Sequence, residues 1–297
     1  MRIDYIAHAS LAISTSDHRI ALDPWWTSGC YADQWHVFPR PVDTSRVEAD
    51  TILISHGHAD HLHEPTLRSL AAGKNAYYPY YWYGGTVDWL QGMGFATVTE
   101  ALSEKTYALS ENTAVTFLVC GQDAPMVIEE GDKVLVNVND ALHSTPDSTI
   151  ELYCARIRKR WPDIDYVFCG FGGASYYPNV FRADDRDERA IGRLREEFFV
   201  AAFCKIVKAL NPRVAVPFAA DFVLLHPSQR WINEIRFPRE EIPAYFDCHY
   251  RSAATRTQVA VMYPGDYLLD HELHPVSPYR ARLACGALDQ LDRKSVV

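Results

Sequence analysis

The chain has 297 residues, a formal net charge of −9 and 48% apolar residues, which is typical of a globular protein rather than a disordered one. The acidic balance argues against a nucleic-acid binder, which would show a basic face, and no apolar run approaches the ~20 residues of a membrane span. The 7 cysteines form no Cys-x-x-Cys pair, which excludes a zinc ribbon and favours a cytoplasmic protein with reduced thiols.

The first half of the chain is expected to alternate short strands with helices. Apolar alternation and β-branched runs predict the strands, and turn residues or a leading proline mark their ends and the helix starts. Strands are predicted at 3–7, 10–14, 19–22, 51–55, 74–78 and 95–99, with helices at 64–71 and 86–91. The connection 24–46 is long and rich in aromatic residues, which is typical of a binding wall.

The second half continues with a β-rich stretch and then long helices. The predicted order is strands 113–119, 126–129 and 133–138, helix 147–160, strand 164–169, helix 186–210, strand 214–216, helix 218–225 and strand 259–263. Two β-rich stretches flanked by helices predict two sheets packed face to face with helices outside. Because we see no repeat and no linker, we predict one domain over 1–297, an α/β protein built as a four-layer αββα sandwich.

The sharpest motif is His56-Gly57-His58-Ala59-Asp60-His61, which directly follows the predicted strand 51–55. Side chains at i and i+2 share a face of an extended chain, so His56 and His58 can point the same way. Asp60 and His61 fall on the following turn. Imidazole and carboxylate without thiolate suit zinc, iron or manganese. We therefore predict a metal site, against the alternative that these histidines cluster at the surface by chance.

This motif, in a chain with two predicted sheets, resembles the metallo-β-lactamase superfamily. Near the start, Ile6-Ala7-His8-Ala9-Ser10 and Leu22-Asp23-Pro24 resemble the subgroup that contains ascorbate-phosphate lactonases and N-acyl phosphatidylethanolamine phospholipase D. Three later segments resemble the catalytic part of CMP-N-acetylneuraminate hydroxylases, namely Asn137-Val138-Asn139-Asp140, Phe171-Gly172-Gly173-Ala174-Ser175, and Val216-Pro217-Phe218-Ala219-Ala220-Asp221-Phe222 with the following His226-Pro227-Ser228.

The resemblance implies two metal ions and assigns the motif to them. His56 and His58 would hold one ion, Asp60 and His61 would hold the second, and Asp140 would bridge both. From the residues alone, Asp140 could equally belong to a turn.

Two histidines that the superfamily pattern implies are missing from this chain. Their places are taken by Cys120-Gly121-Gln122-Asp123 and by Pro217-Phe218-Ala219. Asp123 and His226 are the candidate replacements, although Asp123 could instead cap a turn and His226 could pack against the predicted helix 218–225. A ligand set richer in oxygen than that of dizinc hydrolases would suit iron.

Further residues are assigned around the metals. The resemblance places His8 beside the metal cleft rather than on a metal, although His8 could instead form a hydrogen bond in the core. Together with Asp60 and Asp140 it forms the candidate catalytic set. The aromatic run 75–83 is either core packing or a stacking wall, and the glycine-rich segment 170–175 is either an anion site or a tight turn. The candidate substrate-binding residues are Asp23, Trp25, Tyr80, Tyr83, Gly172 and Gly173.

Two chemistries compete for this site. In the favoured one, two irons activate dioxygen and hydroxylate a small polar metabolite such as a nucleotide-linked sugar. The resembling hydroxylases carry an attached Rieske domain, and this chain has no Cys-x-His pair, so a separate electron-transfer protein would supply the electrons. In the alternative, two ions, zinc among them, activate water for attack on a lactone, ester or phosphodiester. A third interpretation is a metal-depleted binding module.

Overall fold

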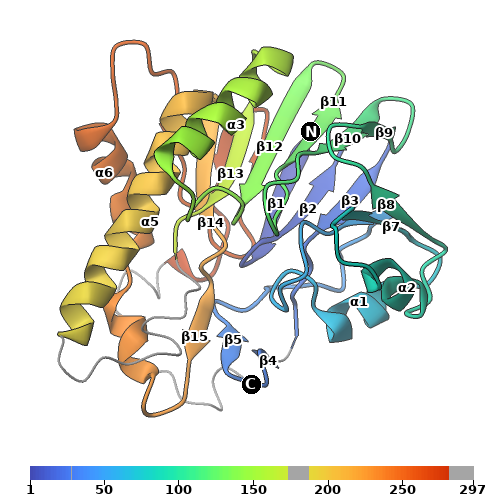
Figure 1. Cartoon of the computed structure of the whole chain (residues 1–297), viewed down its shortest axis with the longest axis horizontal. Helices are drawn as coiled ribbons and strands as arrows, with labels where there is room; N and C mark the ends of the chain where they lie inside the picture. Colours follow the sequence, from blue (N-terminus) through green and yellow to red (C-terminus); the bar gives the residue numbers. More distant parts are fainter. Residues whose placement is uncertain (28, 173–186, 281–297) are drawn as a thin grey trace.

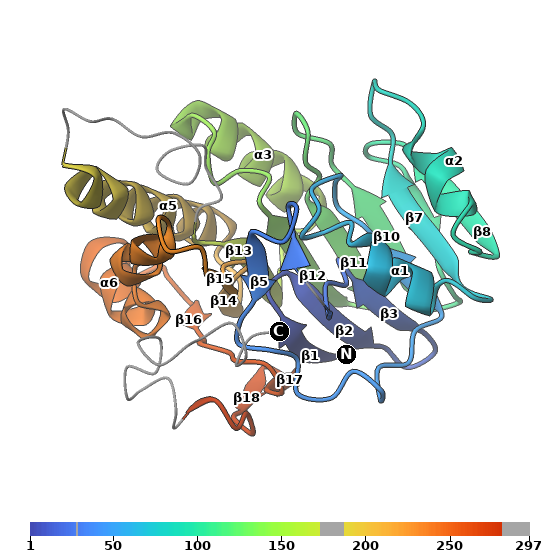
Figure 2. The ribbon, with the colours of Figure 1, turned by 90° about the horizontal axis from the view of Figure 1, so that it is seen from below.

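Two β-sheets pack face to face in this computed structural model, and Figures 1 and 2 show helices on both outer sides. The structure describes residues 1–27, 29–172 and 187–280. None of the described helices is long and apolar enough to cross a membrane.

The first sheet contains the strands that lead into the histidine motif. Its eight strands run in the order β18-β17-β1-β2-β3-β6-β7-β8. Their bounds are Glu272–His274, Tyr267–Leu269, Arg2–Ala7, Ser10–Ser14, Arg19–Leu22, Thr51–Leu53, Asn75–Pro79 and Thr97–Ala101. Strands β3, β6, β7 and β8 are parallel neighbours, so their carboxyl ends meet at one edge. The histidine motif follows β6 at that edge.

The second sheet supplies the opposite wall. Its seven strands run in the order β16-β14-β13-β12-β11-β10-β9. Their bounds are Gln258–Val259, Val214–Phe218, Tyr166–Gly170, Lys133–Asn139, Met126–Glu130, Thr113–Phe117 and Thr106–Ala108. Strands β12, β13 and β14 are parallel, so the turn after β12 opens at the same edge as the turns after β13 and β14.

Helices cover both outer faces, which confirms the predicted four-layer sandwich. The first sheet is covered by α1 (Glu64–Leu70) and α2 (Thr86–Gln91), whose Leu67 and Leu90 are fully buried against it. The second sheet is covered by α3 (Asp147–Arg160), α5 (Glu188–Leu210) and α6 (Ile242–His249). Short 3₁₀ helices η1 (Arg230–Ile235) and η2 (Arg239–Glu241) precede α6.

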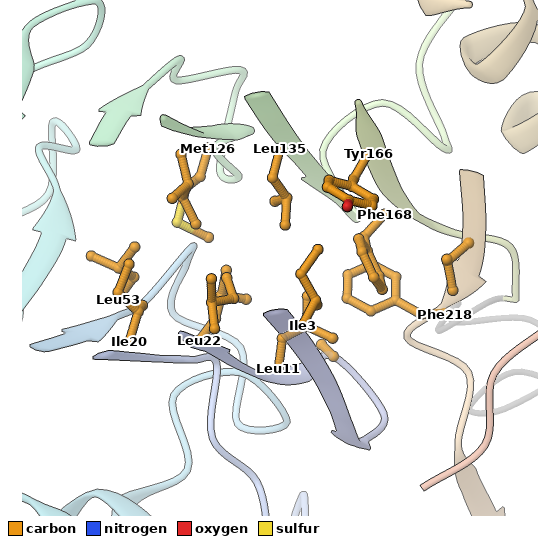
Figure 3. Packing of buried hydrophobic residues seen from close by; sticks show 14 of the residues in the cluster. Ile3, Leu11, Ile20, Leu22, Leu53, Met126, Leu135, Tyr166, Phe168 and Phe218 are labelled. Carbon is orange, nitrogen blue, oxygen red and sulfur yellow. The ribbon is translucent and has the colours of Figure 1, made fainter. Parts of the chain in front are cut away.

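The core between the sheets is apolar and comes from both of them (Figure 3). Leu11 and Leu22 point into it from the first sheet, and Leu135 and Phe168 from the second. Successive side chains of a strand alternate between faces, so Val134 and Val136 of β12 pack instead under the helices. A strand buried on both faces reads as a continuous apolar run, as Val134-Leu135-Val136 does.

One predicted helix is wrong. Residues 218–225 contain strand β15 (Phe222–Leu224), which pairs antiparallel with β5 (Trp35–Val37); β4 (Gly29–Cys30) completes this small third sheet. Phe222 stacks on Trp35 with ring centroids 3.6 Å apart, so an aromatic contact accompanies the pairing of these distant segments. The long connection 24–46 therefore contains a hairpin, and the predicted strand 259–263 shrinks to β16.

The inter-sheet core yields a stability prediction. Leu135 is fully buried, whereas Leu152 on α3 is 56% exposed. Leu135→Ala should lower the free energy of unfolding by about 2–5 kcal/mol, because it removes apolar contacts and leaves a cavity. Leu152→Ala, the matched control, should change it by less than about 0.5 kcal/mol. Urea denaturation followed by circular dichroism measures both, and equal effects would contradict the assigned packing.

Candidate metal centre

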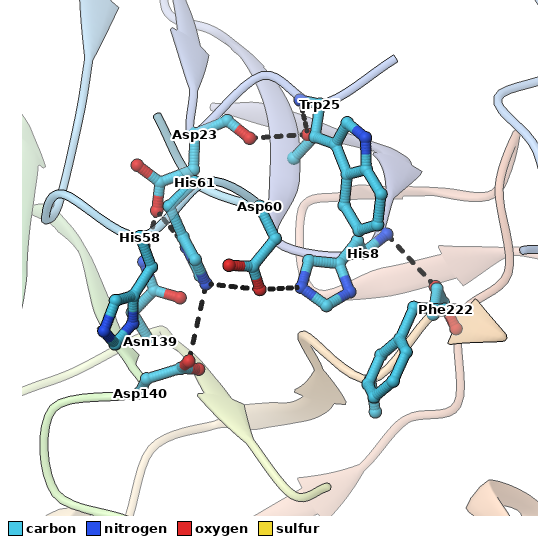
Figure 4. A network of polar contacts seen from close by, with 12 residues as sticks. His8, Asp23, Trp25, His58, Asp60, His61, Asn139, Asp140 and Phe222 are labelled. Carbon is cyan, nitrogen blue, oxygen red and sulfur yellow. Dashed lines mark hydrogen bonds and ion pairs between the residues drawn. The ribbon is translucent and has the colours of Figure 1, made fainter. Parts of the chain in front are cut away.

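The ligand-type side chains converge at one edge of the sandwich, where turns of both sheets meet (Figure 4). The motif His56–His61 follows β6 of the first sheet, and Asp140 follows β12 of the second. Asp123 lies in the turn before β11, closed by the hydrogen bond from Cys120 N to Asp123 O. His8 lies in the turn between β1 and β2.

The distances divide the cluster into two sides. On one side, His56 Nε2 lies 2.8 Å from His58 Nδ1 and 3.3 Å from Asp123 Oδ1. On the other, His61 Nε2 lies 3.4 Å from both Asp60 Oδ2 and Asp140 Oδ2. Among the described residues, three groups have ligand atoms mutually within 4.8 Å; they are His56-His58-Asp123, His56-His61-Asp140 and His8-Asp60-His61.

These separations fit metal ions. Two ligand atoms about 2.1 Å from one ion lie about 3.0 Å apart at a right angle and about 3.4 Å apart at the tetrahedral angle. Two of the buried atoms, His61 Nε2 and Asp123 Oδ1, have no hydrogen-bond partner. Buried polar atoms are normally satisfied, so these two have the environment of ligand atoms. The chemistry and the spacing of the donor set therefore fit two metal ions.

Outer contacts fix the orientation of the histidine rings. His61 Nδ1 lies 3.1 Å from Asp23 Oδ2, and His56 Nδ1 lies 2.9 Å from Ser55 Oγ. Each contact occupies one ring nitrogen and turns Nε2 toward the cluster, which is the usual arrangement around metal-binding histidines.

At His61, Asp60 and Asp140, mutual attraction outweighs the effect of burial. Burial opposes charge on His61, but the Asp60 and Asp140 carboxylates raise its pKa well above the usual range. Burial likewise opposes ionisation of Asp60 and Asp140, yet His61 lowers the pKa of both. Burial is the main cause that lowers the pKa of His56, and the neighbouring His61 lowers it further. Burial, together with the negative charge of Asp140, raises the pKa of Asp123 to about 6. A proton on His61 balances these carboxylates, and a metal cation held by the same side chains would replace it.

The site also depends on a close backbone approach at Gly170. A Cβ atom at this position would lie 3.1 Å from both Asn139 O and Asp140 Oδ1. Glycine at the end of β13 therefore leaves room for the turn that carries Asp140.

A cavity of about 660 Å³ opens beside His56 and His58. Its aromatic lining includes Tyr83 and Trp89. The β4–β5 hairpin closes another side, where Tyr31 donates a 2.6 Å hydrogen bond to Asp60 Oδ1. The cavity thus connects the outside with the His56–His58 side of the cluster.

The structure brings most predicted ligands together but leaves His226 out. Among the described residues, His226 belongs to none of the three groups, and its Nδ1 lies 2.7 Å from Ser228 Oγ. The physical reason is β15, which carries the chain along β5 before His226 is reached. His226 thus lies apart from the three groups in the described part of the chain, whereas Asp123 lies at the cluster.

Several expected substrate contacts are placed differently. Asp23 and Trp25 are both fully buried, and their burial argues against direct substrate contact. Tyr80 is 50% exposed and is not among the described lining of the cavity, whereas Tyr83 is. A Cβ at Gly172 would meet Ala220 Cβ at 2.8 Å, so this glycine permits chain packing. Gly173 lies outside the described residues.

Sequence reasoning missed Tyr31. Its hydroxyl reaches the cluster from a hairpin tip where Tyr31, Ala32 and Asp33 have φ angles of 51°, 55° and 63°. Left-handed backbone is costly for such residues and often marks functional sites. The aromatic richness of 24–46 was the available signal, but without glycines the sequence did not mark this turn.

The two candidate substitute ligands give opposite expectations for metal content. Asp123→Ala should lose about half of the bound metal or more, because it removes a carboxylate that faces His56. His226→Ala should retain the wild-type content. His58→Ala and Asp60→Ala should lose most of it. Elemental analysis of the purified variants measures this, and full metal content in Asp123→Ala would remove Asp123 as a ligand.

Curated relatives carry one recurrent name. The chain is 26% identical over 288 residues to the cytidine monophosphate-N-acetylneuraminic acid hydroxylase of Danio rerio, covering 90% of this chain and 45% of the relative. The Pan troglodytes hydroxylase is 29% identical over 263 residues, and the alignment covers 79% of this chain and 40% of the relative. A Homo sapiens relative described as inactive is 27% identical, and the alignment covers 79% of this chain and 48% of the relative. The chain thus spans about half the length of these relatives.

Solved structures share the fold at low sequence identity. CmlA, a diiron β-hydroxylase from Streptomyces venezuelae, aligns with a TM-score of 0.60 at 17% identity, covering 90% of this chain and 53% of CmlA. An isothiocyanate hydrolase from Delia radicum gut bacteria aligns with a TM-score of 0.60 at 12% identity, covering 91% and 98%. A family model described as a beta-lactamase superfamily domain matches residues 2–149. Residues 2–149 are therefore similar to a beta-lactamase superfamily domain, and the chain has the metallo-β-lactamase fold.

Proposed function

We propose that this chain, as a single domain over 1–297, is a metal-dependent oxygenase that hydroxylates a small polar metabolite. The observation that carries the proposal is the cluster itself, in which Asp60, Asp123 and Asp140 lie among the histidines beside an open cavity. Three carboxylates make the donor set oxygen-rich, which suits iron better than a purely imidazole set would. The hydroxylase names of the curated relatives support the same reaction class.

Two iron ions at this cluster would supply redox chemistry, with electrons from a separate reductant. The chain's own residues would orient the site and bind substrate. Asp23 holds the His61 ring through Nδ1, and Tyr31 donates its hydroxyl proton to a hydrogen bond with Asp60. Burial and the Asp60 charge raise the pKa of Tyr31, so the phenol keeps this proton at neutral pH.

The cavity lining favours part of the expected substrate. Tyr83 and Trp89 suit a flat ring, such as the base of a nucleotide-linked sugar. The described lining contains Asp33 and Glu64 and neither lysine nor arginine, so this cavity alone would not neutralise a phosphate. Within the class of small polar metabolites, the lining therefore favours a substrate that places a neutral ring here.

A second candidate is a dinuclear hydrolase for a lactone, ester or phosphodiester. It is favoured by the imidazoles of His56, His58 and His61, a group that suits zinc. Zinc has no redox chemistry, so such a protein would polarise the substrate and activate water without oxygen or reductant.

Metal identity and oxygen labelling separate the two candidates. Protein produced with iron and zinc both available should contain about two iron ions per chain. With CMP-N-acetylneuraminic acid as the probe, labelled dioxygen and a chemical reductant, the iron form should yield a product that carries one labelled oxygen atom. Omitting either oxygen or reductant should abolish it, and Asp60→Ala provides the metal-site control.

Two other results would contradict the oxygenase proposal. A protein that retains zinc and hydrolyses a model lactone or ester at the same rate with and without oxygen would establish the hydrolase. A protein that binds no metal and turns over neither probe would contradict both candidates.

A further inference from the structure

We propose that His8 is a ligand of the metal ion held by Asp60 and His61, an assignment that rests on the proposed metal centre. Its ring enters the cluster from the β1–β2 turn (Figure 4). His8 Nε2 lies 3.0 Å from Asp60 Oδ2, and the same oxygen lies 3.4 Å from His61 Nε2. All three ligand atoms lie within 4.8 Å of one another.

The spacing is that of ligands sharing one ion. Ligand atoms about 2.1 Å from a metal are separated by about 3.0–3.4 Å for right-angle to tetrahedral arrangements. The Asp60 carboxylate is thus flanked by His8 on one side and His61 on the other. His8 Nδ1 has no hydrogen-bond partner, so Nε2 is the only ring atom of His8 with a polar contact, and it faces the cluster.

The backbone of His8 is held in a conformation that aims the ring. Its φ angle is 51°, in the left-handed region that a non-glycine residue adopts at a cost. The Ala219 N–H donates to its carbonyl oxygen at 3.0 Å, and the Tyr5 hydroxyl, which also contacts Asp221, lies 3.0 Å from the same oxygen. The His8 N–H in turn donates to Asp221 Oδ2 at 3.2 Å.

Aromatic packing fixes the ring itself. His8 is 1% exposed and meets Trp25 edge-on, with ring centroids 5.1 Å apart, and Phe222 at 6.1 Å. The Ala219 contact also ties the β1–β2 turn to the end of β14. A strained, fully bonded backbone and a buried, packed ring give the fixed direction that a metal ligand needs.

A hydrogen bond from His8 to Asp60 is the competing role, and two variants distinguish it from ligation. His8→Ala removes both the imidazole and the hydrogen bond. His8→Gln removes the imidazole but keeps an amide donor that can reach Asp60. His63→Ala is the matched control, because His63 is also buried, lies two residues beyond His61 and belongs to none of the three groups.

The readout is X-ray absorption of each protein at saturating metal, together with metal titration. Wild type and His63→Ala should bind two ions with the same number of imidazole ligands. Both His8→Ala and His8→Gln should show one imidazole fewer per chain, and one of the two ions should bind at least about tenfold more weakly. Circular dichroism verifies that each variant is folded.

Three results would contradict the assignment of His8 as a metal ligand. If His8→Gln kept the wild-type imidazole number and affinity, His8 would be a positioning residue that acts through Asp60, and the inference would be wrong. An unchanged imidazole number in His8→Ala, even with weaker binding, would overturn it as well. If wild type bound no metal, the proposed metal centre would fail together with this inference.

Discussion

The geometry of the site depends on the hydrogen bonds of one buried group, the Asp23 carboxylate. It accepts hydrogen bonds from Ser55 N at 2.7 Å and from Ser55 Oγ at 2.6 Å, on the chain that leaves β6. It also contacts His61 Nδ1 and the Asn139 side-chain amide at the end of β12. The contacts therefore join the first sheet to the second at the edge where the ligands lie. A fully buried carboxylate is costly unless it is paired, and these contacts from both sheets supply its partners.

A second buried carboxylate stabilises the other side. Asp221 pairs with Arg239 and accepts hydrogen bonds from the Tyr5 hydroxyl and the His8 N–H. Arg239 Nη1 donates to Met262 O at 2.8 Å, so the guanidinium is also tied to a distant part of the chain. The two buried aspartates thus position different side chains of the cluster, since Asp23 contacts His61 and Asp221 holds the turn that carries His8.

The sequence predicted those site residues that directly follow a recognisable strand. The motif His56–His61 follows a β-branched strand, and Asp140 follows another, so both positions could be inferred from strand ends. His226 was misplaced because the apolar run 218–225 fits a helix and a buried strand equally well, and pairing with β5 decided the outcome. The contact of Tyr31 with Asp60 depends on the folded hairpin, which no pattern in 24–46 specified.

The two sides of the cluster differ in access, and this difference constrains any reaction there. The described cavity lining includes His56 and His58 but not Asp60, His61 or Asp140. The Asp60–His61 side lies instead beneath the rings of Trp25 and Phe222 that pack on His8.

Among the described residues, the cavity therefore gives access to the His56–His58 side, whereas Asp60 and His61 are buried. Tyr31 contacts both sides of the cluster, because its side chain lines the cavity and its hydroxyl donates a hydrogen bond to Asp60. A substrate that displaces Tyr31 would change the hydrogen bonding of the shielded carboxylate without touching it. Tyr31 thus links the occupancy of the cavity to the buried Asp60 carboxylate.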